Sequence, residues 1–174
     1  QGKNYPGYSR DELVDQLPIL KKKYTSYELY STTTLSDILN EFKNKSVDQR
    51  KITTLETTLL INHHGNFEKG TLPIQAQFAP VYSILSQDLN DDHYPDLILA
   101  GNQTHARVRT GNMDALFGTV LINDTKNGFE YMPQYRSGLQ LKGDVKDMAL
   151  INRHLIVTVN NGPVKLYKLN KLSK

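Results

Sequence analysis

The spacing of hydrophobic residues changes near residue 50 of the chain. Before that point, apolar residues recur every three or four positions, which is the period of one face of an α-helix. After it, apolar and polar residues alternate in short runs rich in Thr, Ile, Leu and Val, as in half-buried strands. The pattern therefore predicts a helical segment over residues 1–50 and a mainly β region over residues 51–174.

The helical segment contains two predicted helices. Ser9 begins the first, because Glu12 lies three residues later in a capping-box pattern. Pro18 should kink or divide this helix. The second helix is predicted over Leu35–Phe42, with Thr34 as its start. The apolar face of the first helix comprises Leu13, Leu17, Leu20 and Tyr24. Neither helix has a polar group within its apolar face, so both faces are interpreted as packing surfaces rather than cofactor sites.

The β region is predicted to consist of short strands separated by turns rich in Asn and Gly. The predicted strands cover residues 52–61, 75–78, 81–85, 97–100, 118–122, 148–151, 155–159 and 164–167. Phe67 and Phe129 each begin the return strand after an Asn/Gly turn. Strands and turns of this kind indicate antiparallel hairpins.

An acidic loop precedes the predicted strand 97–100. Its oxygen-bearing side chains occupy the first, third, fifth and ninth places, and the seventh place offers a backbone carbonyl; these residues are Asp88, Asn90, Asp92, Asp96 and, through its carbonyl, Tyr94. Calcium takes six to eight oxygen ligands, which a tight loop supplies at alternate residues. Carboxylates crowded together without a cation would repel one another. The spacing therefore predicts a Ca²⁺ site formed by these five residues.

The loop allows two other interpretations. A plain acidic turn is one, because Asp and Asn favour turns by bonding their own backbone. An EF-hand is rejected, because its twelfth position requires a bidentate Glu whereas this chain has Leu99, and because both flanks are predicted strands. His93 lies where such loops usually place Gly, so we expect a lowered affinity or a distorted loop.

Composition narrows the possible partners and chemistry. The chain has 174 residues, no Cys and a formal net charge of +3. Its Lys clusters are not interleaved with aromatic residues, so no nucleic-acid partner is expected. No apolar run is long enough to predict a transmembrane segment. Asn-x-Ser/Thr triplets begin at Asn44, Asn102 and Asn123, and would matter only where the source glycosylates proteins.

The β region contains an internal repeat. Residues 57–73 (TTLLINHHGNFEKGTLP) and 118–133 (GTVLINDTKNGFEYMP) are two versions of one strand–turn–strand phrase, each followed by further strands. The period of about fifty to sixty residues is the size of a propeller blade. A repeat with a DxNxD-type loop between two strands resembles the FG-GAP/VCBS repeats of integrin-α-like β-propellers.

A closer resemblance extends along nearly the whole chain. Its phrases are Gly7–Leu13, Gln16–Pro18, Leu20–Tyr24, Ala76–Tyr82, Ala100–Asn102, and Ser137–Leu139 with Gly143–Val145. In this order they resemble the C-terminal region of large Bacteroidota surface proteins that carry VCBS repeats and an ASPIC/UnbV domain and are related to cartilage acidic protein. The resemblance implies about two propeller blades over residues 51–174, a helical excursion over residues 1–50, and an extracellular or outer-membrane-associated location.

The same resemblance places the calcium ligands on Asp88, Asn90, Asp92, Tyr94 and Asp96. The second repeat has Gly143–Met148 at the corresponding place and keeps no ladder of ligands. We therefore expect at most one metal site. Since 174 residues are too few for a closed propeller, other segments or other chains are expected to complete the ring.

Three functional hypotheses follow. The first is a non-catalytic module that binds a glycan, a protein or an outer-membrane partner, with Arg107 and Arg109 on one face of a rim loop or paired to Asp114. The second is part of a polysaccharide-acting enzyme, which requires Asp114 and either Asp124 or Asp144 to converge in a cleft. The third is a purely structural segment that closes a larger propeller. No catalytic residue is predicted; the His63–His64 pair is interpreted as exposed in a turn.

Overall fold

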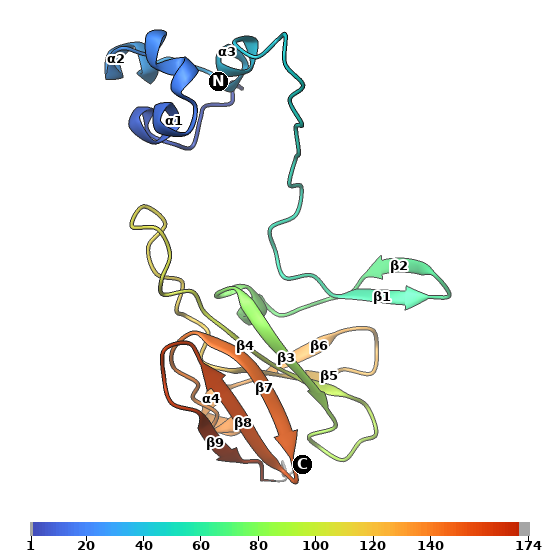
Figure 1. The fold of residues 1–174 in the computed structure, drawn as a ribbon. Helices are drawn as coiled ribbons and strands as arrows, with labels where there is room; N and C mark the ends of the chain where they lie inside the picture. The colour runs from blue at the N-terminus through green and yellow to red at the C-terminus, as the bar shows by residue number, and fades with distance from the viewer. Residues whose placement is uncertain (1, 171–174) are drawn as a thin grey trace. The chain divides into compact units, whose positions relative to one another are not determined.

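The computed structural model describes residues 2–170 and divides the chain into two compact units, residues 1–53 and residues 54–174 (Figure 1). The first unit is helical and the second is built from antiparallel sheets. The described chain is therefore mainly β, as predicted. Among the described residues the strands do not close into a propeller ring.

The first unit contains α1 (Arg10–Gln16), the 3₁₀ helix η1 (Pro18–Lys22), α2 (Tyr27–Ser31) and α3 (Leu35–Asn40). Ser9 and Glu12 form the predicted capping box at the start of α1, and Pro18 divides the first predicted helix into α1 and η1. Thr34 caps α3 in the same way through Asp37. The core of this unit consists of Val14, Leu20, Tyr24 and Ile38.

Two helix predictions need correction. The second predicted helix ends at Asn40 rather than at Phe42, because residues 41–44 continue as turns. Helix α2 was not predicted; its signal is Ser26, whose hydroxyl accepts a hydrogen bond from the Leu29 N–H at 3.3 Å.

The second unit contains three antiparallel sheets. A separate hairpin is formed by β1 (Leu60–His63) and β2 (Asn66–Lys69); a four-stranded sheet by β3 (Val81–Gln87), β4 (Asp96–Gly101), β5 (Thr119–Asn123) and β6 (Phe129–Met132); and a three-stranded sheet by β7 (Val145–Ile151), β8 (His154–Val159) and β9 (Lys165–Lys168). Both repeated phrases of the sequence form hairpins, β1–β2 and β5–β6. The two-residue turn between β7 and β8 has positive φ at both of its residues, Asn152 and Arg153. This conformation matches the twist of the two strands that the turn joins.

The main core lies between the four-stranded and the three-stranded sheets. Alternation along β4 sends Ile98 and Ala100 into this core, whereas Leu97 and Leu99 pack on the opposite face of the sheet. The main core contains the buried side chains Ile98, Ala100, Val120, Met132, Leu139, Leu141, Val145, Met148, Leu155 and Val157. Each large aliphatic side chain buried in this way contributes about 1.5–3 kcal/mol to the free energy of unfolding.

Two predicted strand segments are wrong. Residues 52–58 form no strand, and regular pairing begins only at Leu60. Residues 75–78 were predicted as strand but belong mainly to the 3₁₀ helix η2 (Ile74–Gln77), which begins after Pro73; the Pro73 carbonyl accepts the Ala76 N–H at 3.0 Å. The helix α4 (Gln134–Ser137) was also missed, although Pro133 precedes it and Gly138, at φ 66°, ends it.

Candidate cation site between β3 and β4

The acidic loop connects β3 to β4 and is organised by a ladder of side chain–backbone hydrogen bonds. Asp88 accepts the N–H of Asn90 at 3.3 Å, Asn90 accepts the N–H of Asp92 at 3.0 Å, and Asp92 accepts the N–H of Tyr94 at 2.8 Å. Each bond spans two residues, which is the spacing of an Asx turn. Three such turns in succession bring the predicted alternate oxygens into one short loop.

Asp88 is the anchor of this ladder. Its carboxylate also accepts the N–H groups of Asp92 at 3.2 Å and His93 at 2.9 Å. Burial alone would raise the pKa of Asp88, but hydrogen bonds from the backbone of His93, Asp92, Asp91 and Asn90 outweigh it and lower that pKa. Asp88 is therefore held in its charged form.

His93 adopts the left-handed backbone conformation that the sequence pattern assigns to Gly, with φ 73°. Asp91 adopts a similar conformation, with φ 60°. A left-handed residue with a Cβ atom costs about 1–2 kcal/mol. The chain accepts this strain at His93 while its N–H bonds Asp88, so the turn keeps its shape without Gly.

Asp96, the ninth residue of the pattern, is completely buried at the start of β4. One of its carboxylate oxygens accepts the N–H of Leu89 and the other accepts the N–H of Asn123, each at 2.9 Å. Burial raises the pKa of Asp96, and the negative charges of Asp92 and Asp88 raise it further, against the lowering effect of the two N–H groups. Asp96 thus lies within the electrostatic field of the other two carboxylates.

The donor chemistry of the loop fits a hard cation. Three carboxylates, the Asn90 amide oxygen and the Tyr94 carbonyl are all oxygen donors, the type that Ca²⁺ prefers. Within residues 2–170, no Lys, Arg or His forms an ion pair with any of these three carboxylates. Among them Asp92 has a neutral side-chain partner, the Asn90 amide, which donates to it at 2.8 Å and would give up this bond to a bound cation.

The described residues contain no group of three His, Cys, Asp or Glu side chains arranged to hold a metal ion. Asp88, Asp92 and Asp96 therefore do not form such a group, although three Asp side chains would suffice for one. In the structure the loop is held by hydrogen bonds, and its side chains would have to rearrange to bring the three carboxylates, the Asn90 amide oxygen and the Tyr94 carbonyl around one ion.

The rim loop, residues 102–114, is fixed at its base and extends outward. Asn102 is buried at φ 87°, and its amide bonds both the N–H and the carbonyl of Leu116, at 3.0 and 2.8 Å, and the carbonyl of Gly143 at 3.0 Å. Asp144, also buried, accepts the N–H of Thr104 at 2.9 Å. These contacts connect the end of β4, the approach to β5 and the start of β7.

The tip of the rim loop is exposed. Arg107, Val108 and Arg109 are all exposed, and the Arg107 carbonyl accepts the N–H groups of Thr110 at 2.8 Å and Gly111 at 3.2 Å in a tight turn. The rim loop follows the end of β4, whereas the acidic loop precedes its start, so the two arginines and the acidic loop's donors belong to opposite ends of this strand.

Two of the carboxylates named in the enzyme hypothesis, Asp124 and Asp144, lie near opposite ends of β5. Asp124 follows the last residue of β5 and accepts the backbone N–H groups of Lys126 and Gly128 in the turn to β6. Asp144 lies near the opposite end of β5, through the contacts of Asn102. Five residues of strand separate the two ends by roughly 16 Å. Asp114 is exposed on the rim loop.

Both histidines of the pair are exposed, as interpreted from the sequence, but only His64 lies in the turn, because His63 is the last residue of β1. His63 is exposed and lies 3.8 Å from the Glu68 carboxylate, and His64 occupies the turn with φ 55°. Asn102 and Asp144 are the structurally important polar residues that the sequence reasoning missed in this role. Asn102 begins a glycosylation triplet, but its burial prevents it from accepting a glycan.

Comparison with known proteins finds no matching family model, no matching curated protein and no matching solved structure. Within residues 2–170, no helix has the length and apolar character needed to cross a membrane.

Proposed function

We propose that residues 54–174 form a calcium-stabilised, non-catalytic β module that serves in binding or scaffolding at a cell surface. The observation that carries the proposal is the arrangement around Asp96. A buried carboxylate with a raised pKa lies in the field of Asp88 and Asp92, and none of the three has a cationic side-chain partner among the described residues. A cation in the loop would relieve this repulsion.

The proposed role of the ion is to rigidify the connection between two strands. Asp96 bonds the backbone of Leu89 on the loop and of Asn123 at the end of β5. Leu89 also packs against the main core. An ion held by Asp88, Asn90, Asp92, Asp96 and the Tyr94 carbonyl would therefore stabilise the loop together with the adjoining ends of β4 and β5.

The two packed sheets are proposed to be neighbouring blades of a β-propeller. The proposal is supported by the β3–β6 sheet, which has the four antiparallel strands of a blade, and by the shared core with β7–β9. It follows that other segments or chains complete the ring. The exposed rim loop, with Arg107 and Arg109 at its tip, is the proposed surface for a glycan, protein or outer-membrane partner.

Thermal unfolding in calcium and in chelator tests the proposed ion. Calcium that binds only the folded state must raise the melting temperature through linkage. We expect a rise at millimolar Ca²⁺ in the wild type, and no rise in an Asp88→Ala/Asp92→Ala variant. An Asp114→Ala variant, which removes an exposed carboxylate outside the loop, should keep the rise. A wild-type melting temperature that is the same in calcium and chelator contradicts the proposal.

A further inference from the structure

A pocket opens at one edge of the main core, where the four-stranded sheet β3–β6 faces the three-stranded sheet β7–β9. The four-stranded sheet ends with β6, whereas the three-stranded sheet ends with β9. One strand spacing of about 4.8 Å is therefore left without an opposing strand among the described residues. The resulting cavity has a volume of about 380 Å³, within the size range of small-molecule sites.

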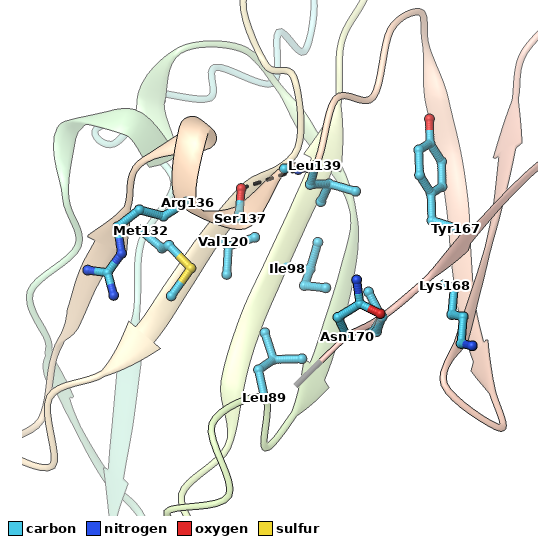
Figure 2. A pocket seen from close by; sticks show the side chains of 12 residues that line it. Leu89, Ile98, Val120, Met132, Arg136, Ser137, Leu139, Tyr167, Lys168 and Asn170 are labelled. Atoms are coloured by element: carbon cyan, nitrogen blue, oxygen red, sulfur yellow. Dashed lines mark hydrogen bonds between the residues drawn. The ribbon is translucent and has the colours of Figure 1, made fainter. Parts of the chain in front are cut away.

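The pocket has an apolar floor. Figure 2 shows Ile98, Val120 and Met132, from β4, β5 and β6, side by side along the floor, with Leu139 above them and Leu89 at the lower end. Ile98, Val120 and Met132 are 2%, 4% and 9% exposed, so the floor belongs to the main core. A surface of this kind binds an aliphatic chain by removing apolar area from water.

The rim of the pocket is cationic. Arg136 on α4 lies beside Met132 at one end, and Lys168 on β9 lies at the other end (Figure 2). Both side chains are exposed, and neither forms an ion pair with any residue in the described part of the chain. The lining contains no Asp or Glu. The charges at the rim therefore complement an anion.

The remaining polar groups of the lining are partly engaged within the protein. The Tyr167 hydroxyl donates to the Gln140 carbonyl at 3.2 Å, and the Ser137 hydroxyl donates to the Gln134 carbonyl at 3.3 Å. The Asn170 side chain lies between the two sheets in Figure 2. Arg136 and Lys168 are the charged residues of the lining.

We propose that this pocket binds an aliphatic monocarboxylate, with the chain on the floor formed by Ile98, Val120 and Met132 and the carboxylate at Arg136 or Lys168. The guanidinium fork suits a carboxylate because it offers two parallel N–H donors. The pocket shares Leu89 with the acidic loop, whereas the proposed carboxylate contacts, Arg136 and Lys168, lie outside that loop.

Methyl NMR of the intact chain tests the proposal at the pocket itself. The chain has three methionines, of which Met132 lines the pocket and Met113 lies on the rim loop. Labelling the methionine methyl groups with ¹³C and titrating with decanoate should shift the Met132 signal in a saturable way. The Met113 signal should stay in place and serves as the internal control.

Charge variants decide whether the rim recognises the carboxylate. Replacing both cations, as Arg136→Gln/Lys168→Gln, should weaken decanoate binding about tenfold or more. Lys126→Gln, at an exposed turn outside the pocket, should leave binding unchanged. Charge reversal, as Arg136→Glu/Lys168→Glu, should transfer the Met132 response from decanoate to decyltrimethylammonium.

Four outcomes would overturn the proposal, of which three concern the intact chain. Those three are an unchanged Met132 signal in decanoate, equal responses to decanoate, decyltrimethylammonium and neutral decyl maltoside, and full decanoate affinity in the double Gln variant. A response that appears only after residues 171–174 are removed would also overturn it.

Discussion

The Asp96 carboxylate accepts a hydrogen bond from the backbone N–H of Asn123 at 2.9 Å, across 27 positions of sequence. Its other oxygen accepts the N–H of Leu89 at the same distance. One wholly buried side chain therefore joins the acidic loop, the start of β4 and the end of β5. Asp96 therefore belongs both to the candidate cation site and to the contact between the start of β4 and the end of β5.

Asp96→Ala should cost about 2–4 kcal/mol of unfolding free energy even without calcium, because two N–H groups beside it lose their acceptor. Urea unfolding in chelator measures this cost apart from any ion. Asp114→Ala, which changes an exposed carboxylate, should stay within about 0.5 kcal/mol of wild type. Equal costs for the two variants would contradict the structural role of Asp96.

Asn102 offers a second test, since its backbone conformation and its side-chain bonds can be separated. Asn102→Ala loses three hydrogen bonds and places a Cβ methyl at φ 87°, whereas Asn102→Gly loses the bonds but tolerates this φ. Both variants should be destabilised by about 2–4 kcal/mol in urea unfolding, with Gly the milder. Asn66→Ala, at an exposed strand position, provides the control. A Gly variant as stable as wild type would show that the bonds contribute nothing.

Asp144 should make stability depend on pH in the acid range. Burial alone would raise the pKa of Asp144, but bonds from Thr104 and His105 and the charge of Lys146 outweigh it and lower that pKa. The stability that the ionised group contributes is present above the ordinary Asp pKa of about 3.9 and is lost as pH falls through the lower folded pKa.

Asp144→Asn is therefore expected to cost about 1–2 kcal/mol at pH 7, and less as the pH falls below about 4. Urea unfolding at both pH values gives the comparison. The variant should also free the base of the rim loop, so trypsin should cut faster at Arg107 or Arg109 than in wild type. A cost that is constant with pH, together with unchanged cleavage, would show that Asp144 does not hold the loop.

Local patterns predicted the local structures of this chain well. Ser9 with Glu12, Thr34 with Asp37, and Pro18 fixed helix starts because capping and proline geometry depend on residues a few positions apart. Residues 81–85 and 97–100 were predicted as strands and belong to the paired strands β3 and β4, and the Asx turns between them match the interpretation of the loop as an acidic turn. The mainly β class is confirmed for the same reason.

Helices α2 and α4 were missed although their signals, Ser26 for one and Pro133 with Gly138 for the other, are local. The other failures depend on distant contacts. The Thr-rich residues 52–58 have strand propensity but no partner strand; the Thr57 backbone bonds the Gln77 side chain instead, with its N–H at 2.8 Å from the amide oxygen. Asn102 and Asp144 act across 14 and 40 positions, so no local spacing could reveal their roles. The pocket depends on a difference in strand number between two sheets, which the sequence pattern did not predict.

Terbium luminescence tests the central claim most directly. Terbium replaces calcium at oxygen sites and emits when a nearby tyrosine absorbs light, and Tyr94 lies within the loop in a chain that has no Trp. A cation site in this loop should give emission that calcium displaces and that Asp88→Ala/Asp92→Ala abolishes. Tyr94→Phe should reduce the emission, while calorimetry still detects calcium binding through the retained carbonyl. Emission that persists in the double Ala variant, or its absence in the wild type, would contradict a cation site between β3 and β4.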